Sequence, residues 1–189
     1  MTLSESGLFD REAPEELLSE RTALVAAEKS LILTDLHSIL VFRIGTEWLA
    51  LPTAFFDEVV EQCKIHSLPH HRDGLVSGIV NIRGELLLCV AFGALLGLGR
   101  ELPPERREGN RVRAPRLLVC SRERSRLAFQ VNEVHGVVRY HQRDLRALPG
   151  TLSKETPGTF SRGMLPWTNH TLGCLDEDLV YYALNRGIA

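Results

Sequence analysis

The stretch VNIRGELLLCV, residues 80–90, holds the side chain best suited to polar recognition, Arg83. Its apolar arms enclose a short polar segment with Arg83, Gly84 and Glu85, and this pattern predicts a β-hairpin with a charged tip. A guanidinium offers five N–H donors in a rigid fork that matches a carboxylate, and we expect Glu58 of FFDEVVEQ to be its partner within the chain. The alternative is an ordinary surface ion pair, which contributes only ~0–1 kcal/mol and has no role in binding.

The patterns that mark common catalytic sites are absent from the sequence. It contains no GxSxG nucleophile turn, no GxxxxGK[ST] phosphate loop, no HExxH zinc helix and no CxxC redox pair. The carboxylates of Asp144, Asp176, Glu177 and Asp178 fall at predicted turns, where aspartate bonds to its own backbone. We therefore expect a recognition protein and not an enzyme. An enzyme whose site is assembled from distant carboxylates is the alternative.

Cysteine and histidine spacing predicts neither a disulfide framework nor a metal site. The four cysteines are far apart in the sequence and three of them lie in apolar segments, which is typical of buried free thiols. His70 and His71 form the one adjacent histidine pair, and neighbouring side chains on a strand point in opposite directions. The sequence therefore gives no reason to expect a metal or another cofactor.

The composition is that of a globular protein without a strong overall charge. The chain has 189 residues, of which 44% are hydrophobic, and its formal net charge is −2. This content is enough for a core, and the charge provides no bulk attraction to nucleic acid or to an anionic membrane. The acidic start MTLSESGLFDREAPEE is unlike a signal peptide, and no apolar run reaches the ~18 residues of a spanning helix. We expect a cytoplasmic protein without direct membrane insertion.

One local basic segment leaves a nucleic-acid-binding β-barrel as an alternative. Residues 100–126 contain nine arginines against four glutamates. Barrels that bind nucleic acid combine basic strands with stacking aromatic side chains. Here the basic residues fall in a predicted loop, whereas Trp48, Trp167, Tyr181 and Tyr182 lie in apolar segments. We therefore favour a solvated loop and expect no nucleic-acid partner.

Hydrophobic periodicity separates an acidic N-terminal extension, 1–35, from a β-rich remainder. Within the extension, Pro14, acidic residues in the first turn and Lys29 at the end predict a helix over 14–29. After it the period changes to two, and short apolar segments are separated by turn residues, which predicts an all-β fold of barrels or a sandwich. Strands are expected on both sides of the Gly-Thr turn in SILVFRIGTEWLALP and near 57–62, 75–82, 86–92, 116–121, 126–131, 134–140, 160–165, 171–176 and 178–184.

Weak internal similarity suggests a duplicated unit. The segments LVF (40–42), DEVV (57–60), SLP (67–69) and GIV (78–80) are followed in the same order by LLV (117–119), NEVH (132–135), ALP (147–149) and GML (163–165). Such a repeat predicts two similar small barrels that are joined by a connection around 93–115. Barrels of about five short strands bury little surface alone, so we expect the two to pack together and to leave a groove for a partner between them.

Four segments of the chain together resemble the consecutive signatures of CheW-like chemotaxis coupling proteins. They are LVFRIGTEWLALP, DEVVEQCKIHSLPHHRDGLVSGIVNIRGELLLCV, LAFQVNEVHGVV and GCLDEDLVYYAL. The most specific piece, GIVNIRGELLL, is similar to the family's G-[LV]-[IV]-N-[LI]-R-G-E hairpin, and the resemblance covers residues 36–186. It implies two intertwined five-stranded SH3-like barrels. It also implies a non-enzymatic adaptor that links the cytoplasmic tips of chemoreceptors to a CheA-type histidine kinase, whose own regulatory domain is CheW-like.

The resemblance also implies which residues bind partners. Arg83 falls on the arginine of the family hairpin, which supports the receptor-binding groove, and Glu58 falls on the glutamate that pairs with it. Phe56 lies two residues before Glu58 on the same face of its strand. Val134 and Val137 fall in the strand of the second barrel whose neighbourhood closes the groove.

Three positions depart from the family pattern. Asn132 stands where the family has an aspartate, and Leu88 and Ala91 stand where it commonly has a proline and an aspartate after the hairpin. We expect the receptor and kinase contacts to differ accordingly. Together with the N-terminal helix, the pattern is similar to a branch that serves Wsp-type surface-sensing arrays, in which the kinase drives a diguanylate cyclase response regulator. The coupling protein of a flagellar or other chemotaxis pathway is the alternative.

Overall fold

The computed structural model describes residues 35–69, 75–99, 107–108, 111–112, 114–122, 125–148 and 160–188. The chain divides into two units, Met1–Leu36 and His37–Ala189. The helix predicted over 14–29 lies outside the described residues, and the features below belong to the second unit.

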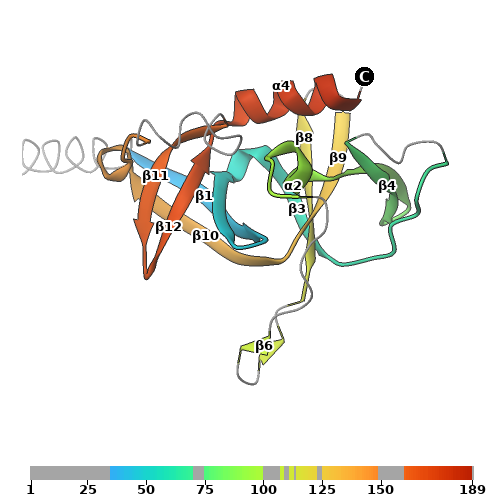
Figure 1. The fold of residues 1–189 in the computed structure, drawn as a ribbon, viewed down its shortest axis with the longest axis horizontal. Helices are drawn as coiled ribbons and strands as arrows, with labels where there is room; N and C mark the ends of the chain where they lie inside the picture. The colour runs from blue at the N-terminus through green and yellow to red at the C-terminus, as the bar shows by residue number, and fades with distance from the viewer. Residues whose placement is uncertain are drawn as a thin grey trace, which may run out of the picture. The chain divides into compact units, whose positions relative to one another are not determined.

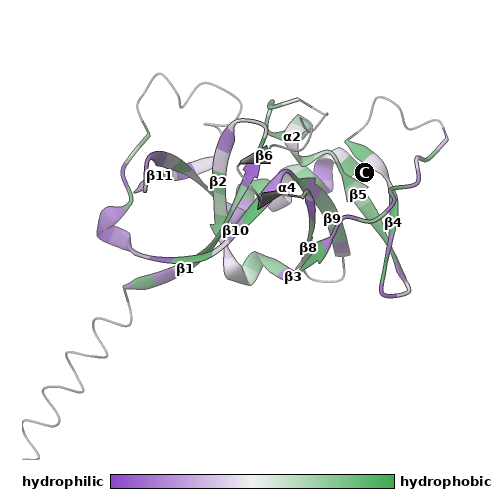
Figure 2. Ribbon diagram, turned by 90° about the horizontal axis from the view of Figure 1, so that it is seen from below, coloured by the Kyte–Doolittle hydropathy of each residue, from purple (hydrophilic) through white to green (hydrophobic). Residues whose placement is uncertain are grey.

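Ten strands form two sheets of five strands each, which lie beside each other in Figure 2. We name the sheet with the order β10-β1-β2-β12-β11 barrel 1, and the sheet with the order β3-β8-β9-β5-β4 barrel 2. Barrel 1 consists of β1 (Leu36–Ile44), β2 (Glu47–Pro52), β10 (Glu133–His141), β11 (Ser161–Trp167) and β12 (His170–Leu175). Barrel 2 consists of β3 (Phe56–Glu61), β4 (Val76–Ile82), β5 (Glu85–Val90), β8 (Arg116–Arg122) and β9 (Ser125–Val131). The predicted fold class, an all-β protein of two five-stranded units, is confirmed.

The chain interleaves the two barrels. It begins barrel 1 with β1 and β2, enters barrel 2 through the 3-10 turn η1 (Thr53–Phe55), and returns after β9 to complete barrel 1. Each barrel contains two antiparallel hairpins joined by one parallel pair, β2 with β12 in barrel 1 and β5 with β9 in barrel 2, and a fifth strand, β10 or β3, at one edge. The sequence predicts that a connection around 93–115 joins the two barrels. In the structure, that segment instead joins β5 to β8 of the same sheet. Each barrel takes strands from both halves of the repeat, so the barrel boundary does not follow the repeat boundary.

Three apolar clusters explain why the inner strands are apolar on both faces. On β1, Ile39 and Val41 pack in a cluster formed by barrel 1 alone. Leu40, Phe42 and Ile44, on the other face of the same strand, pack in a cluster that both barrels share. A third cluster belongs to barrel 2 alone. Strands that are buried on both faces carry continuous apolar runs, as in ILVF (39–42), rather than a strict alternation.

The internal repeat is visible at two glycines. Isolated bridges pair His66 with Ile79 in barrel 2 and Arg146 with Met164 in barrel 1, so the SLP and ALP segments follow equivalent positions. A Cβ on Gly78 would lie 2.3 Å from the carbonyl oxygen of His66. A Cβ on Gly163 would lie 2.8 Å from the carbonyl oxygen of Arg146. Only glycine allows the bridging segment to approach the strand this closely in both barrels.

The C-terminal segment corrects one prediction. Residues 178–184, predicted as a strand, belong to helix α4 (Glu177–Ile188), which Figure 1 shows running across the top of both sheets. The Oδ1 atom of Asp176 accepts the backbone N–H groups of Asp178 and Leu179 at 3.0 and 3.1 Å, as an N-cap does. Val180 and Leu184, one helical turn apart, are buried in the shared cluster.

Short elements complete the described chain. Helix α2 (Phe92–Leu95) follows β5, and the 3-10 turn η2 (Gln142–Asp144) follows β10. In the segment predicted as a solvated loop, β6 (Arg107–Glu108) and β7 (Arg111–Val112) form a small hairpin. This hairpin projects from the sheets at the lower side of Figure 1.

Candidate partner-binding site

The β4–β5 hairpin presents Arg83 at a rigid tip. Ile82 pairs with Glu85, so Arg83 and Gly84 alone form the loop, with φ of 52° and 91°. Two central residues with positive φ are the mark of a type I′ turn, whose twist matches that of the strands. The side chain of Asn81 accepts the backbone N–H of Gly84 at 2.9 Å and fixes the loop. The predicted hairpin with a charged tip is confirmed.

Arg83 and Glu58 form the predicted ion pair. The Nη2 atom of Arg83 lies 3.2 Å from Oε2 of Glu58 on β3, an edge strand of barrel 2. The side chain of Arg83 is 80% exposed, whereas that of Glu58 is only 19% exposed. Because β3 and β4 stand at opposite edges of the sheet order, this pair connects the two edges of barrel 2.

Arg126, which the sequence did not suggest, is the centre of the charged cluster around Glu58. Its Nε lies 3.0 Å from Oδ2 of Asp57 and its Nη2 lies 3.3 Å from Oε1 of Glu58, while its Nη1 bonds to Glu85. The hydroxyl of Ser121, opposite Arg126 in the β8–β9 ladder, donates to Oδ1 of Asp57 at 2.6 Å. The hydrogen bond to Asp57 raises the pKa of Arg126. Like every guanidinium, Arg126 carries its positive charge throughout the physiological pH range.

The charged cluster covers one end of the barrel 2 core. Alternate residues on a strand share a face, and Glu58 and Arg126 share theirs with Val60 and Ala128, which both contact the barrel 2 cluster. A β-bulge between Phe56 and Glu58 shifts the register there. Bulges re-aim side chains, and this one lies next to Asp57, which belongs to the same group of ion pairs.

The other three predicted partner-binding residues do not join this cluster. Phe56 is half-buried and packs its ring against Phe42 and Phe129, both at 6.1 Å between centroids. Val134 is also half-buried and packs against the shared cluster. Val137 is 60% exposed on β10 and, three residues later, faces the other side of that strand. The structure thus brings Glu58 and Arg83 together, places Phe56 and Val134 on the shared core, and leaves Val137 apart.

Asn132, where the resemblance implies an aspartate, lies where the chain crosses from barrel 2 to barrel 1. Its Oδ1 accepts the backbone N–H of Gly45 in the β1–β2 turn at 2.7 Å, and its own N–H donates to the carbonyl of Arg43 at 2.9 Å. The next residue, Glu133, forms a buried ion pair of 3.2 Å with Arg43. An amide oxygen accepts the bond from Gly45 as a carboxylate would, so the lost charge leaves this contact intact.

The corresponding end of barrel 1 carries a group of aromatic rings beside the Arg43–Glu133 pair, since Trp48 is the cross-strand partner of Arg43. The rings of Trp48 and Trp167 lie 5.2 Å apart, and His170 and His135 contact them at 5.7 Å from Trp48 and 4.4 Å from Trp167. Both tryptophans pack against the barrel 1 cluster. Their rings therefore complete a core, which disfavours the stacking surface that a nucleic-acid-binding barrel needs.

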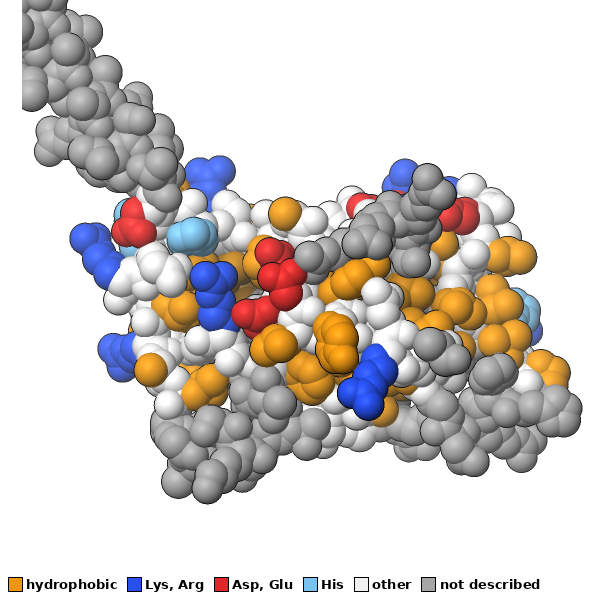
Figure 3. All heavy atoms as spheres, turned by 90° about the horizontal axis from the view of Figure 1, so that it is seen from above, with side chains coloured by type: hydrophobic (Ala, Val, Ile, Leu, Met, Phe, Trp, Pro, Cys, Tyr) orange, Lys and Arg blue, Asp and Glu red, His pale blue; other side chains and the backbone are white. Residues whose placement is uncertain are grey.

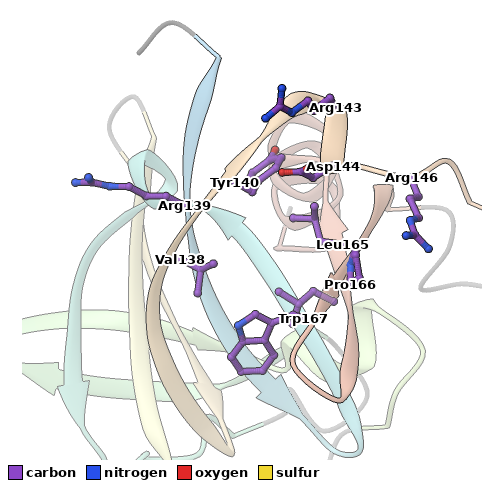
Figure 4. Close-up of a pocket in the computed structure, with 10 residues that line it drawn as sticks. Val138, Arg139, Tyr140, Arg143, Asp144, Arg146, Leu165, Pro166 and Trp167 are labelled. Atoms are coloured by element: carbon purple, nitrogen blue, oxygen red, sulfur yellow. The ribbon is translucent and has the colours of Figure 1, made fainter. Parts of the chain in front are cut away.

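A cavity of about 410 Å³ opens between the two edge strands of barrel 1. Figure 4 shows Val138, Arg139 and Tyr140 of β10 on one side and Leu165, Pro166 and Trp167 of β11 on the other. A second cavity of about 420 Å³ lies beside α4, where Leu179 and Tyr182 are exposed and apolar side chains gather in Figure 3. Neither cavity is lined by Arg83 or Glu58. Side chains from both barrels meet in the shared cluster, and the predicted partner groove stays a prediction.

All four cysteines are free thiols, as predicted. Cys89, Cys120 and Cys174 are buried, and burial raises the pKa of each to about 12. Within the described ranges, no three histidine, cysteine or carboxylate side chains are grouped as a metal site would require. In the same part of the chain, no helix has the length and apolar character to cross a bilayer.

Comparison with known proteins identifies the family. The family model of the CheW-like domain matches residues 38–180. The crystal structure of the scaffolding protein TtCheW from Thermoanaerobacter tengcongensis is similar with a TM-score of 0.58 and 19% sequence identity, over 74% of this chain and 84% of that one. A sequence comparison with curated proteins gives no match. Since the family match spans most of the chain and includes both barrels, this protein belongs to the CheW-like domain family.

Proposed function

We propose that this chain is a non-enzymatic adaptor that couples the cytoplasmic tips of chemoreceptors to a CheA-type histidine kinase. The observation that carries the proposal is the CheW-like match over residues 38–180, a family of scaffold adaptors. The exposed Arg83 at the tip of a rigid hairpin gives such an adaptor a charged contact point. An adaptor of this kind acts in the cytoplasm, at receptor arrays.

The contacts of the adaptor centre on Arg83, with Glu58 as its ion-pair partner within the chain. Coupling requires only that the signalling states of the receptor bind the adaptor with different affinity. Phe56 and Val134, half-buried on the shared core, and Val137, exposed on β10, extend the proposed contact region from barrel 2 to barrel 1. Leu88 and Ala91, at the departures from the family pattern, are packed against the shared cluster and buried, respectively. They act on partner contacts through packing and not by direct charge.

Within this function we propose the Wsp-type branch, whose kinase drives a diguanylate cyclase response regulator. The support is the apolar character of Leu88 and Ala91 where the family commonly has proline and aspartate, together with the acidic N-terminal extension. The coupling protein of a flagellar or other chemotaxis array is the competing assignment. Binding to receptor and kinase pairs from the two kinds of system, measured side by side, separates the two assignments.

Reconstitution tests the adaptor function directly. Receptor cytoplasmic fragments on vesicles are mixed with the kinase and the chain, and co-sedimentation and kinase autophosphorylation are measured. We expect the wild-type chain to bring the kinase into the pellet and Arg83→Glu to reduce its own binding about tenfold or more. Arg116→Glu is the matched control, because Arg116 forms an exposed 3.5 Å pair with Glu61 elsewhere in barrel 2. Binding of the folded Arg83→Glu variant at the wild-type level would remove Arg83 from the site.

A further inference from the structure

We propose that Arg126 is the permanent counter-ion of Glu58 and thereby frees Arg83 to exchange Glu58 for a carboxylate of the bound partner. This inference rests on the proposed adaptor function and names the chemical group that Arg83 recognises. Arg126 is a positioning residue in this scheme, and Arg83 is the residue that contacts the partner.

The two arginines hold Glu58 in different ways. Arg126 contacts Oε1 of Glu58 and also binds Asp57 and Glu85, so three carboxylates of two strands fix its guanidinium. Among the described ion pairs, Arg83 has one partner, the Oε2 atom of Glu58. The side chain of Arg126 is 33% exposed, whereas that of Arg83 is 80% exposed. Arg126 is therefore a fixed part of the barrel. Arg83 is held by one contact, and the rest of its side chain is solvated.

The contact between Arg83 and Glu58 is also weak in geometry. Oε2 of Glu58 is buried and has no hydrogen-bond partner, although the Nη2 atom of Arg83 lies at 3.2 Å. The pair is thus an ion pair without a directed hydrogen bond, and its arginine is largely solvated. A bidentate bond to a carboxylate on a partner would use the guanidinium fork better.

Arg126 determines how much free energy the barrel loses when Arg83 leaves Glu58. Removing the last cation from a half-buried carboxylate is strongly unfavourable, because the remaining charge is desolvated and unpaired. Glu58 keeps Arg126 at 3.3 Å when Arg83 leaves, so its charge stays compensated. Without Arg126, Glu58 would have Arg83 as its one cation and would retain it. The tip backbone need not change, because the turn and the bond from Asn81 fix it independently.

This scheme predicts a rescue that a purely structural role cannot produce. In the receptor co-sedimentation assay, we expect Arg126→Gln to bind about tenfold more weakly than wild type, since Glu58 then retains Arg83. The double variant Arg126→Gln/Glu58→Gln removes the competing carboxylate and should return binding to within about threefold of wild type. Arg116→Gln is the control that removes an arginine of the same barrel outside the cluster. Wild-type binding by Arg126→Gln, or a double variant as weak as the single one, would overturn the inference.

A measurement without any partner separates this inference from the adaptor function. In protein with ¹⁵N-labelled arginine, relaxation of the Arg83 Nε–H, assigned with Arg83→Gln, reports the mobility of the guanidinium. We expect a mobile Arg83 in wild type, a restrained one in Arg126→Gln, and a mobile one again in the double variant. Arg126→Lys, which keeps a charge but not the fork, should lie between wild type and Arg126→Gln and covers the case in which glutamine impairs folding. A restrained Arg83 in wild type would refute the exchange even if the chain binds receptor, whereas a mobile one with no receptor binding would refute only the adaptor function.

Discussion

Arg43 and Glu133 form a 3.2 Å ion pair with side chains only 10% and 6% exposed, at the point where the chain passes from barrel 2 back to barrel 1. The Nη1 atom of Arg43 also donates to the carbonyl of Gly45, whose N–H is bound by Asn132. The β1–β2 turn and the start of β10 are therefore joined by one buried polar group of residues. In the internal repeat Glu133 is the counterpart of Glu58, so both barrels hold a glutamate at this position with an arginine from an inner strand.

Removing one member of this pair should destabilise the fold strongly. We expect Arg43→Met to lower the free energy of unfolding by ~3–5 kcal/mol, because Glu133 would remain as a buried charge without its cation. Urea denaturation followed by circular dichroism measures the change. The double variant Arg43→Met/Glu133→Met should recover a large part of the loss, since it leaves no buried charge. If the double variant is as unstable as the sum of the two single ones, the ion-pair explanation is wrong.

The close approach at Gly163 gives a second prediction. Gly163→Ala would place a Cβ 2.8 Å from both the carbonyl oxygen of Arg146 and Cγ of Leu145, so the bridge between Arg146 and Met164 must shift. We expect a loss of stability of ~1–3 kcal/mol, measured by thermal unfolding. Gly173→Ala is the matched control on β12, because its Cβ lies closest to Cδ2 of Leu49, at 3.2 Å, and meets the backbone oxygen of Trp48 only at an ordinary contact distance of 3.8 Å. Equal effects of the two substitutions would contradict this account.

The stability that helix α4 gives to the fold should come from its buried face and not from its exposed face. Leu184 is fully buried in the shared cluster, and Leu184→Ala is expected to cost ~2–5 kcal/mol of unfolding free energy. Tyr182, which is 65% exposed, provides the control, and Tyr182→Ala should change stability by ~0.5 kcal/mol or less. Chemical denaturation of the two variants compares them directly. A larger effect at Tyr182 would show that the helix packs by another face.

Thiol reactivity should distinguish one cysteine from three. Burial raises the pKa of Cys89, Cys120 and Cys174 to about 12, so at pH 8 only about one in 10,000 of each is a thiolate. Cys63 is half-buried and accessible to reagent. We expect Ellman's reagent to modify one thiol rapidly in the native protein and the other three only after unfolding. Rapid modification of all four without denaturant would be inconsistent with the buried positions.

The same thiols should make the free energy of unfolding fall as the pH becomes alkaline. The pKa of these thiols is raised in the folded chain. The unfolded chain therefore releases their protons at lower pH than the folded chain does, from the ordinary thiol pKa of 9.0 upward. Their contribution to stability is therefore complete below pH 9 and falls as the pH rises toward about 12. Substituting Cys89 with alanine should flatten this fall. A denaturation series between pH 8 and pH 11 measures it.

Much of the fold could be predicted from local sequence signals. The NIRGE turn predicts its hairpin because Gly84 permits the positive φ that the loop requires, and the period of two located most strands. The C-terminal helix could not be separated from a strand by its short apolar run LVYYAL alone. The N-cap signal was present in Asp176, followed by the acidic first turn of Glu177 and Asp178, but it is equally typical of a turn.

The site was partly predictable for a similar reason. Glu58 and Arg83 could be paired because a family pattern places them together, whereas Arg126 carries no local signal. Its sequence neighbourhood, SRERSR, is typical of charged residues exposed to solvent. Its role appears only when β9 is set between β8 and β5, which brings Asp57 and Glu85 within reach of one guanidinium. Side-chain contacts across three strands follow from topology, and the repeat did not reveal that topology.

The nesting of one barrel within the sequence of the other has a consequence during synthesis. All strands of barrel 2 leave the ribosome before β10, so this barrel can assemble while translation continues. The β1–β2 hairpin emerges first but must wait for β10, β11 and β12 before its second apolar face is covered. A finished barrel 2 provides the surface that covers the other apolar face of the β1–β2 hairpin, so the order of synthesis matches the order in which the two faces can be buried.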